Sequence, residues 1–382
     1  MHIAQKKKIV VLGMMSRHPV AGMIWLTVQY LIGFERLGYE VYYVEPQGGI
    51  PGVDSALGAA WIERALRPFG LHRWAYHAIH GDGRCYGMSE IALRELYASA
   101  HWIFNLHGST KPTSELSGPG RLVYIGTDPV EMEISLWEGD PTSANFLRPH
   151  CAFFTWATNL GKPDCRLPVP TQFQFKPTCQ PCVLDLWDPG DRPPGESFTT
   201  IGNWKQDYRE VEFQGETYYW SKHHEFMKFI GLPERTTQPF ELALSSFEEQ
   251  DRRLLEGHGW RVFKAGSLGD DSDLYRQYIF RSCGEFTVAK DQYVRMRTGW
   301  FSDRSASYLC AGRPVINQES GFSNVYPTGE GLFAFSTMDE ILAAVDSINT
   351  DYRRHSRAAR EVARQYMSYD VVLGHMLAEL GD

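Results

Sequence analysis

Short apolar runs that end in glycine or in polar loops alternate along the chain with longer segments of helical periodicity. Residues 8–13 are rich in β-branched side chains and stop at Gly13, which is typical of a strand buried on both faces. After a loop, an apolar segment reaches Leu37 and Gly38, where glycine is a common helix end. Residues 40–45 then predict a second strand, so the opening of the chain indicates a βαβ unit with parallel strands.

The same alternation continues on both sides of a proline-rich stretch. Seven prolines lie between residues 165 and 195, and such a cluster favours a crossing between domains. Amphipathic helices are predicted over residues 338–348 and 351–380. Further strands are predicted at residues 102–106, 121–125, 197–202, 240–244, 260–263, 286–289 and 313–316. In an open α/β sheet, ligands bind where such strands end.

The chain length indicates more than one domain. At 382 residues it exceeds what a single hydrophobic core usually supports. We therefore predict an α/β protein with two doubly wound Rossmann-like domains that face a cleft. The predicted boundaries are an N-terminal domain at residues 1–178, a crossing at 179–196, a C-terminal domain at 197–365, and a final helix at 366–382 that packs back on the N-terminal domain.

Composition and charge exclude several classes of protein. The chain is 43% apolar and 22% charged, which indicates neither disorder nor low complexity. Its net charge of −8 gives no global reason to bind a polyanion. No apolar run reaches the roughly 18–20 residues of a membrane helix, and the seven scattered cysteines suit a reducing compartment. Because the basic residues at the start lead into a predicted strand rather than a signal peptide, we expect a cytoplasmic protein without a membrane span.

The most informative motif is Tyr-Leu-Cys-Ala-Gly-Arg-Pro-Val-Ile at residues 308–316. It resembles the helix-to-strand signature of nucleotide-sugar glycosyltransferases of the GT-B fold. Residues 319–322 fall where that family keeps a small-residue loop against the donor sugar and diphosphate. Residues 329–341 resemble the family's Gly-x-Gly-Leu run, and residues 299–305 resemble uncharacterised bacterial proteins labelled as glycosyltransferases. The N-terminal motifs of the same family are matched at Gly13, at residues 19–22 and at residues 37–41.

The resemblance implies transfer of a sugar from a nucleotide-diphosphate sugar to an acceptor hydroxyl. It implies no metal and no cofactor besides the nucleotide sugar, with the acceptor bound by the N-terminal domain and the nucleotide sugar by the C-terminal domain. One position departs from the pattern, because many relatives hold the nucleotide ribose with a glutamate where this chain has Ser307. Either Asp303, one helical turn earlier, supplies the carboxylate, or the ribose is held differently. The nucleotide, with UDP as the candidate, therefore stays open.

Enzymes of this kind stabilise a departing diphosphate with a helix N-terminus and a cation. Ser302 is a favourable N-cap, and Lys290 and Arg304 are the candidate cations. Glu319 is expected to hydrogen-bond sugar hydroxyls, and Asn203 lies at the end of a predicted strand. An ordinary turn or a solvated surface charge would also explain each of these residues. The predicted donor-binding residues are Gly22, Asn203, Lys290, Ser302, Asp303, Arg304, Ser305, Glu319, Ser320, Gly321 and Phe322.

Two residues at strand ends are candidate catalytic bases for an inverting transfer. His18 lies in the first loop, and its ordinary pKa near 6.5 suits a base. Asp128 follows a predicted strand and could orient His18 or act itself. The alternatives are a plain loop residue for His18 and a helix N-cap for Asp128. A transferase that retains configuration needs no such base.

One cysteine motif and one aspartate motif give only weak signals for a metal site. Cys179 and Cys182 form a single Cys-x-x-Cys without a second pair, and residues 270–273 contain an Asp-x-Asp that is more typical of an exposed loop or helix cap. We therefore predict no metal site.

Three rival functions stay open beside glycosyl transfer. A nucleotide-sugar 2-epimerase shares the fold, and a catalytically silent nucleotide-sugar sensor would bind without reacting. A Rossmann oxidoreductase is disfavoured because residues 13–18 lack the Gly-x-Gly-x-x-Gly spacing. The partners are thus a nucleotide sugar and an acceptor that is a small molecule, a saccharide or a hydroxylated nucleobase in DNA. Residues 50–101 are rich in Trp, Tyr and His and either line an acceptor pocket or form core.

Overall fold

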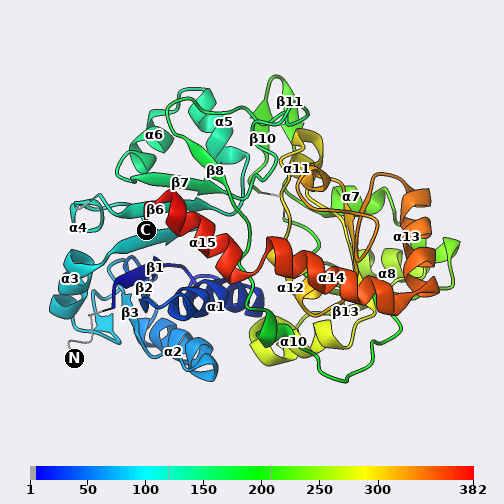
Figure 1. Ribbon diagram of the computed structural model, residues 1–382, viewed down its shortest axis with the longest axis horizontal. Helices are drawn as coiled ribbons and strands as arrows, with labels where there is room; N and C mark the ends of the chain where they lie inside the picture. Colours follow the sequence, from blue (N-terminus) through cyan, green and yellow to red (C-terminus); the bar gives the residue numbers. More distant parts are fainter. Residues whose placement is uncertain (1–5, 119, 207) are drawn as a thin grey trace.

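The computed structural model describes residues 6–118, 120–206 and 208–382, and within them the chain forms two α/β halves around two mainly parallel sheets (Figure 1). The first sheet has the strand order β4-β3-β2-β1-β5-β6-β7-β8, and every neighbouring pair in it is parallel except β3 with β4. Its strands are β1 (Lys8–Leu12), β2 (Glu40–Glu45), β3 (Trp74–His77), β4 (Cys85–Tyr86), β5 (Trp102–Leu106), β6 (Leu122–Gly126), β7 (Ala152–Thr155) and β8 (Phe175–Pro177).

The second sheet has the order β13-β12-β9-β14-β15-β16, and its described pairs are all parallel. Its strands are β9 (Phe198–Asn203), β12 (Phe240–Ser245), β13 (Arg261–Lys264), β14 (Gly284–Thr287), β15 (Val315–Gln318) and β16 (Leu332–Phe335). A separate antiparallel hairpin joins β10 (Val211–Phe213) to β11 (Glu216–Tyr218). The predicted α/β class is confirmed, and each predicted strand is present within two residues of its expected position. The strands β3, β4, β7, β8 and β16 and the β10–β11 hairpin were not predicted.

Helices cover both sheets (Figure 1). Those of the first half are α1 (Ala21–Arg36), α2 (Ser55–Leu66), η1 (Arg67–Phe69), α3 (Glu90–Ser99), α4 (Ser114–Ser117), α5 (Glu131–Trp137) and α6 (Pro141–Leu147), followed by η2 (Leu184–Trp187) in the proline-rich crossing. Those of the second half are α7 (His223–Met227), η3 (Leu232–Arg235), α8 (Glu249–Gly257), α9 (Ser267–Asp270), α10 (Ser272–Phe280), α11 (Asp291–Met296), α12 (Asp303–Cys310), η4 (Phe322–Asn324), α13 (Met338–Thr350), α14 (Tyr352–Tyr366) and α15 (Tyr369–Glu379). Within the described residues, no helix is long and apolar enough to cross a membrane.

The end of the chain returns to the first half. The prediction of one helix over residues 351–380 is wrong, because α14 and α15 are separated at Met367 and Ser368. Cys182 of the proline-rich crossing forms two backbone hydrogen bonds at this break. Its N–H donates to the Met367 carbonyl at 2.6 Å, and its carbonyl accepts from Tyr369 N–H at 2.9 Å. Helix α15, red in Figure 1, then lies against α1, where a Cβ on Gly33 would stand 2.6 Å from a Leu373 methyl carbon.

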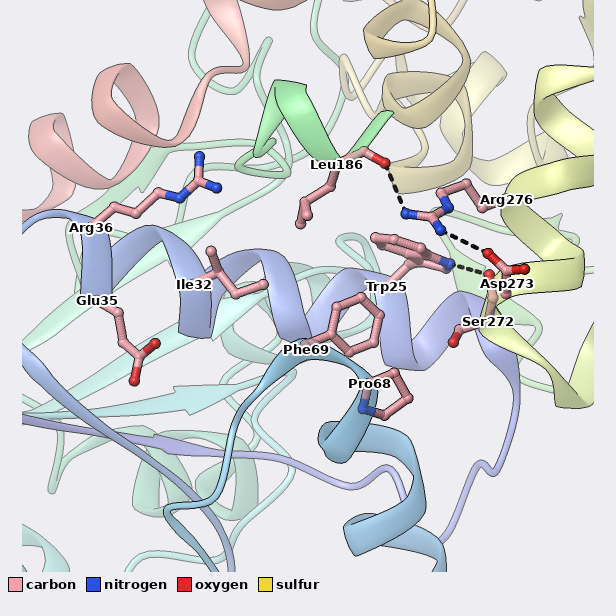
Figure 2. Close-up of a pocket in the computed structure, with 10 residues that line it drawn as sticks. All are labelled: Trp25, Ile32, Glu35, Arg36, Pro68, Phe69, Leu186, Ser272, Asp273 and Arg276. Atoms are coloured by element: carbon pink, nitrogen blue, oxygen red, sulfur yellow. Dashed lines mark hydrogen bonds and ion pairs between the residues drawn. The ribbon is translucent and has the colours of Figure 1, made fainter. Parts of the chain in front are cut away.

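Helix α1 also forms a seam with the second half (Figure 2). The Trp25 indole N–H donates to the Ser272 carbonyl of α10 at 2.8 Å, and the Arg276 guanidinium lies 5.5 Å from the Trp25 ring. The ring of Phe69 meets Trp25 edge to face at 5.1 Å. A cavity of about 590 Å³ runs along this seam, and all its lining residues come from α1, η1, η2 and α10 rather than from strand ends. The seam therefore holds the halves together away from the sheet edges where ligands bind.

Candidate functional site

A cavity of about 280 Å³ lies between the two halves at the carboxyl ends of both sheets. In each sheet the strand order reverses beside the central strand, between β1 and β5 in the first and between β9 and β14 in the second. Residues that follow these strands, among them Met14, His107 and Lys290, line the cavity together with Asn203 at the end of β9. Open α/β sheets bind ligands at such switch points. The fold thus brings two switch points onto one cavity.

The wall from the first half includes His107, which follows β5. Its backbone has φ 63, a left-handed conformation that is uncommon for a residue with a side chain. Its Nδ1 lies 2.7 Å from the Thr127 hydroxyl, and its Nε2 is buried without a hydrogen bond to any described residue. Burial lowers the pKa of His107 to about 4, so the ring is neutral at pH 7. His107 thus brings to the cavity wall a neutral imidazole whose Nε2 has no partner among the described residues.

The wall from the second half carries two lysines. Lys290 is 7% exposed, and its Nζ lies 2.9 Å from the centre of the Trp220 ring. Burial lowers the pKa of Lys290 to about 8, although nearby Asp128 opposes the shift. Lys222 also lines the cavity, and its pKa is held well below the ordinary value by burial and then by the charges of Arg304 and Lys290. Two crowded, poorly hydrated ammonium groups favour an anionic ligand.

Asp128 lies between these walls and is held by the second half. Its carboxylate accepts a hydrogen bond from the Tyr293 hydroxyl at 2.8 Å and lies 3.3 Å from Lys290 Nζ and 3.8 Å from Arg209. Burial alone would raise the pKa of Asp128, but Lys290, Arg209 and the Tyr293 hydrogen bond hold it below its usual range. His18 is exposed on the first loop and does not line the cavity in the described structure, and the contacts of Asp128 go to Tyr293, Lys290 and Arg209 instead. The structure therefore does not form the His18–Asp128 pair.

Helix α12 begins at the cavity. The Ser302 hydroxyl caps it by accepting from Arg304 N–H at 3.2 Å, and both Ser302 and Asp303 line the cavity. Burial raises the pKa of Asp303 above its usual value. Ser305, one turn further on, is fully buried, and its hydroxyl has no partner among the described residues. The helix N-terminus and its partial positive charge therefore face the same space as Lys222.

Arg304 has a structural role in addition to its place beside the cavity. Its guanidinium forms a buried ion pair with Glu285 of β14. It also donates to the Ile201 carbonyl at 2.7 Å and to the Thr287 hydroxyl at 2.8 Å. These contacts fasten α12 to the central strands of the sheet and occupy the guanidinium. The cations left for a ligand at this wall are the two lysines.

The predicted loop at residues 319–322 lies behind the cavity rather than on its lining. The Ser320 hydroxyl donates to the Trp300 carbonyl at 2.8 Å, and the Ser320 carbonyl accepts from Gly299 N–H at 2.6 Å. Glu319 accepts from the Gly321 N–H, and Phe322 packs on Phe301 at 5.4 Å. Gly321 has φ 96, and a Cβ there would stand 2.7 Å from the Arg297 carbonyl oxygen. The loop thus positions Trp300, which does line the cavity.

Of the predicted donor-binding residues, the lining includes Gly22, Asn203, Lys290, Ser302, Asp303 and Arg304. Gly22 is the second residue of α1, and a Cβ on it would meet no atom within 4 Å, so the space beside the first turn of this helix is open. The Asn203 side chain accepts a hydrogen bond from the Ser245 hydroxyl.

Within the described residues, no group of three or more His, Cys, Asp and Glu is placed to hold a metal ion, and Cys179 and Cys182 are buried.

Comparison of the whole structure with solved structures identifies the architecture. No family model matches the chain, and no curated protein matches its sequence. Anabaena HepE, solved with UDP and glucose, superposes with a TM-score of 0.59 over 99% of this chain and 100% of its own, at 12% identity. AviGT4, a glycosyltransferase involved in avilamycin A biosynthesis, superposes with a TM-score of 0.54 over 98% of this chain and 96% of its own, at 12% identity.

An alpha-glucosyltransferase solved with UDP and a 13-mer DNA that contains an A:G mismatch superposes with a TM-score of 0.61 over 99% of this chain and 100% of its own, at 8% identity. This chain has the GT-B fold. The GT-B architecture that residues 308–316 suggested is thereby confirmed. Because the identities are low, the likeness establishes the GT-B fold and not the reaction.

Sequence reasoning missed several residues that the GT-B fold brings to the cavity: His107, Thr127, Trp156, Lys222 and Trp300. His107 and Thr127 follow β5 and β6, so their positions at strand ends were a usable signal. Lys222 lies between the β10–β11 hairpin and α7, in a part of the chain without a strand-end pattern. Only the folded chain shows that it lies beside α12.

Proposed function

We propose that this chain is a glycosyltransferase that moves a sugar from a nucleotide-diphosphate sugar to an acceptor hydroxyl. The observation that carries the proposal is the pair Lys222 and Lys290 beside the N-terminus of α12, in the cavity at both switch points. UDP is the candidate nucleotide because the solved structures with the same fold include HepE and an alpha-glucosyltransferase in complex with UDP.

The lysines and the helix supply what a departing diphosphate requires. Negative charge grows on the diphosphate as the bond to the sugar breaks, and preorganised cations and backbone N–H groups stabilise that charge. Burial is the main cause of the lowered pKa of Lys222 and of Lys290, so their charged forms are poorly hydrated in the free protein, although Asp128 already offsets part of the shift at Lys290. A bound diphosphate adds negative charge beside both side chains, so binding favours protonated lysines.

Asp128 acts in this proposal as a positioning residue for Lys290. Its carboxylate stays ionised because three groups of the second half lower its pKa, which makes it a weak base. Its contacts at 2.8 and 3.3 Å instead fix the Tyr293 hydroxyl and the Lys290 ammonium. His107 faces the cavity from the opposite wall and is the group suited to hydrogen-bond the sugar or the acceptor.

A thermal-shift panel of nucleoside diphosphates tests the proposal, since a ligand that binds the native state raises the melting temperature. We expect UDP to raise it more than ADP, GDP and CDP do at equal concentration. A UDP-sugar incubated with the protein and without an acceptor distinguishes transfer from 2-epimerisation, because only an epimerase converts the donor into its 2-epimer. Absence of any shift with all four nucleotides would overturn the proposal.

A further inference from the structure

A second hollow, of about 390 Å³, lies at the carboxyl ends of strands β1 and β2 of the first sheet. Its walls include Ser16 and Arg17, which follow β1, and Gly49 and Ile50, which follow β2. Strands β2, β1 and β5 are neighbours in the sheet, and the β1–α1 loop contributes Met14 to the first cavity and Ser16 to the second. One loop therefore separates the two spaces.

The mouth of this hollow is apolar. Leu57 is 65% exposed, Ile50 59% and Val53 47%, and all three line it. Val20, 45% exposed, follows the lining residue Pro19. Isolated exposed apolar side chains are ordinary, whereas several of them gathered around a concave surface mark a binding site.

The ring of Tyr76 forms the floor of the hollow and packs closely against two glycines. A Cβ on Gly48 would stand 2.1 Å from this ring, and a Cβ on Gly58 would stand 2.8 Å from its hydroxyl. The wall is fixed as well, because Ser16 N–H donates to the buried Glu45 carboxylate at 2.8 Å. Such packing indicates a preformed pocket, and its volume lies within the roughly 300–1,000 Å³ typical of small-molecule sites.

Two basic side chains border this apolar space. The Arg64 guanidinium lies 4.6 Å from the centre of the Trp61 ring, and Arg17 donates to the Gln47 carbonyl. Within the described residues, neither arginine forms an ion pair with a carboxylate. An apolar hollow with polar groups at its edge matches a ligand that has an apolar body and a polar end.

We propose that this hollow binds the alkyl or aryl body of an amphipathic acceptor, whose hydroxyl then reaches across the β1–α1 loop toward the interdomain cavity. The acceptor role rests on the proposed glycosyl transfer, whereas binding of the apolar body does not. The class of acceptor is therefore a small hydroxylated molecule with an apolar portion.

Calorimetric titration with two glycosides that differ only in the apolar portion tests the inference. The probes are n-octyl β-D-glucopyranoside below its micelle concentration and methyl β-D-glucopyranoside. We expect the octyl compound to bind at least tenfold more tightly, because its chain adds buried apolar surface. Leu57→Glu should weaken octyl binding at least tenfold, whereas Ile91→Glu, at a 73% exposed position on α3 outside both hollows, should leave it unchanged.

The outcomes separate this inference from the proposed function. Equal affinity for the two glycosides would overturn the inference even if UDP raises the melting temperature. So would an equal loss of affinity for the octyl compound in Leu57→Glu and Ile91→Glu. Binding of the octyl compound without a response to UDP would overturn the acceptor role together with the proposed function. Wild-type protein that sediments with phosphatidylcholine vesicles, when Leu57→Glu does not, would show a membrane-binding surface and would also overturn the acceptor assignment.

Discussion

Lys290 Nζ of the second half lies 3.3 Å from the Asp128 carboxylate of the first half. The two residues follow β14 and β6, so the pair joins the carboxyl ends of the two sheets across the cavity. The Tyr293 hydroxyl, 2.8 Å from Asp128, completes the contact. The proposed diphosphate site therefore includes a cation that is already held in place by the opposite domain.

Removal of either cavity lysine should weaken UDP binding. Lys290→Ala and Lys222→Ala are each expected to raise the Kd for UDP at least tenfold, because a hydrogen bond to a charged group contributes about 1.5–3 kcal/mol. Calorimetric titration measures the effect. Lys264→Ala, at an exposed position on the edge strand β13, is the matched control and should bind UDP as the wild type does. Equal affinity in all four proteins would contradict the assignment.

Affinity for UDP should depend on pH through Lys290, whose pKa is about 8 in the free protein. A lysine is charged below its pKa, so affinity is highest at neutral pH and falls as the pH rises through 8. UDP affinity is expected to fall about tenfold between pH 7 and pH 9, because Lys290 is neutral in about nine-tenths of the molecules one pH unit above its pKa. Titrations at both pH values measure it, and Lys290→Ala should show a smaller loss. An unchanged Kd in the wild type would count against the role of Lys290.

Asp128→Asn distinguishes a positioning residue from a base. Without the carboxylate that favours its charged form, the pKa of Lys290 should fall further, and the pH at which UDP affinity declines should move below that of the wild type. Titrations across pH 6–9 give the midpoint. Asp128 would instead be the base if the pH profile of the transfer rate lost its acidic limb while the midpoint pH of UDP binding stayed unchanged.

Arg304→Ala should act mainly on stability. Arg304 and Glu285 form a buried ion pair, and loss of one partner from such a pair costs about 3–5 kcal/mol because the other charge stays buried. Urea unfolding measures the free energy of unfolding. Arg281→Ala, which removes the partner of Glu241 from a 59% exposed arginine, should cost no more than about 1 kcal/mol. A stable Arg304→Ala protein with weak UDP binding would instead favour a direct contact with the donor.

His107→Asn should reduce transfer without reducing UDP affinity. Asparagine tolerates the left-handed backbone of this residue, at φ 63, but lacks the unpaired ring nitrogen. We expect kcat to fall at least tenfold, equivalent to about 1.4 kcal/mol, while the Kd for UDP stays within about twofold. Steady-state kinetics and titration measure the two effects separately. Wild-type kcat in this variant would remove His107 from the reaction.

Most strands of the two sheets, and their mainly parallel direction, follow from local patterns in the sequence. Residues 8–13 and 197–202 are β-branched runs that end in glycine, and both form central strands of their sheets. The helix-to-strand motif at residues 308–316 likewise forms the end of α12 and the start of β15. Such elements are predictable because each depends on hydrophobic periodicity and on the residues that end it.

The partners of individual side chains are decided by the tertiary structure. Nothing near Arg304 in the sequence shows that its guanidinium pairs with Glu285, nor that Lys222 lies beside α12. Asp128 could be placed at a strand end from the sequence, but its pairing with Lys290 depends on how the two domains meet. The sequence by itself determined most of the strands, their mainly parallel direction and several of the strand ends that line the cavity, because periodicity and strand ends are local. The packing of the two domains decided which charges are buried together, because burial and charge–charge contacts depend on distances between residues that are remote in the chain.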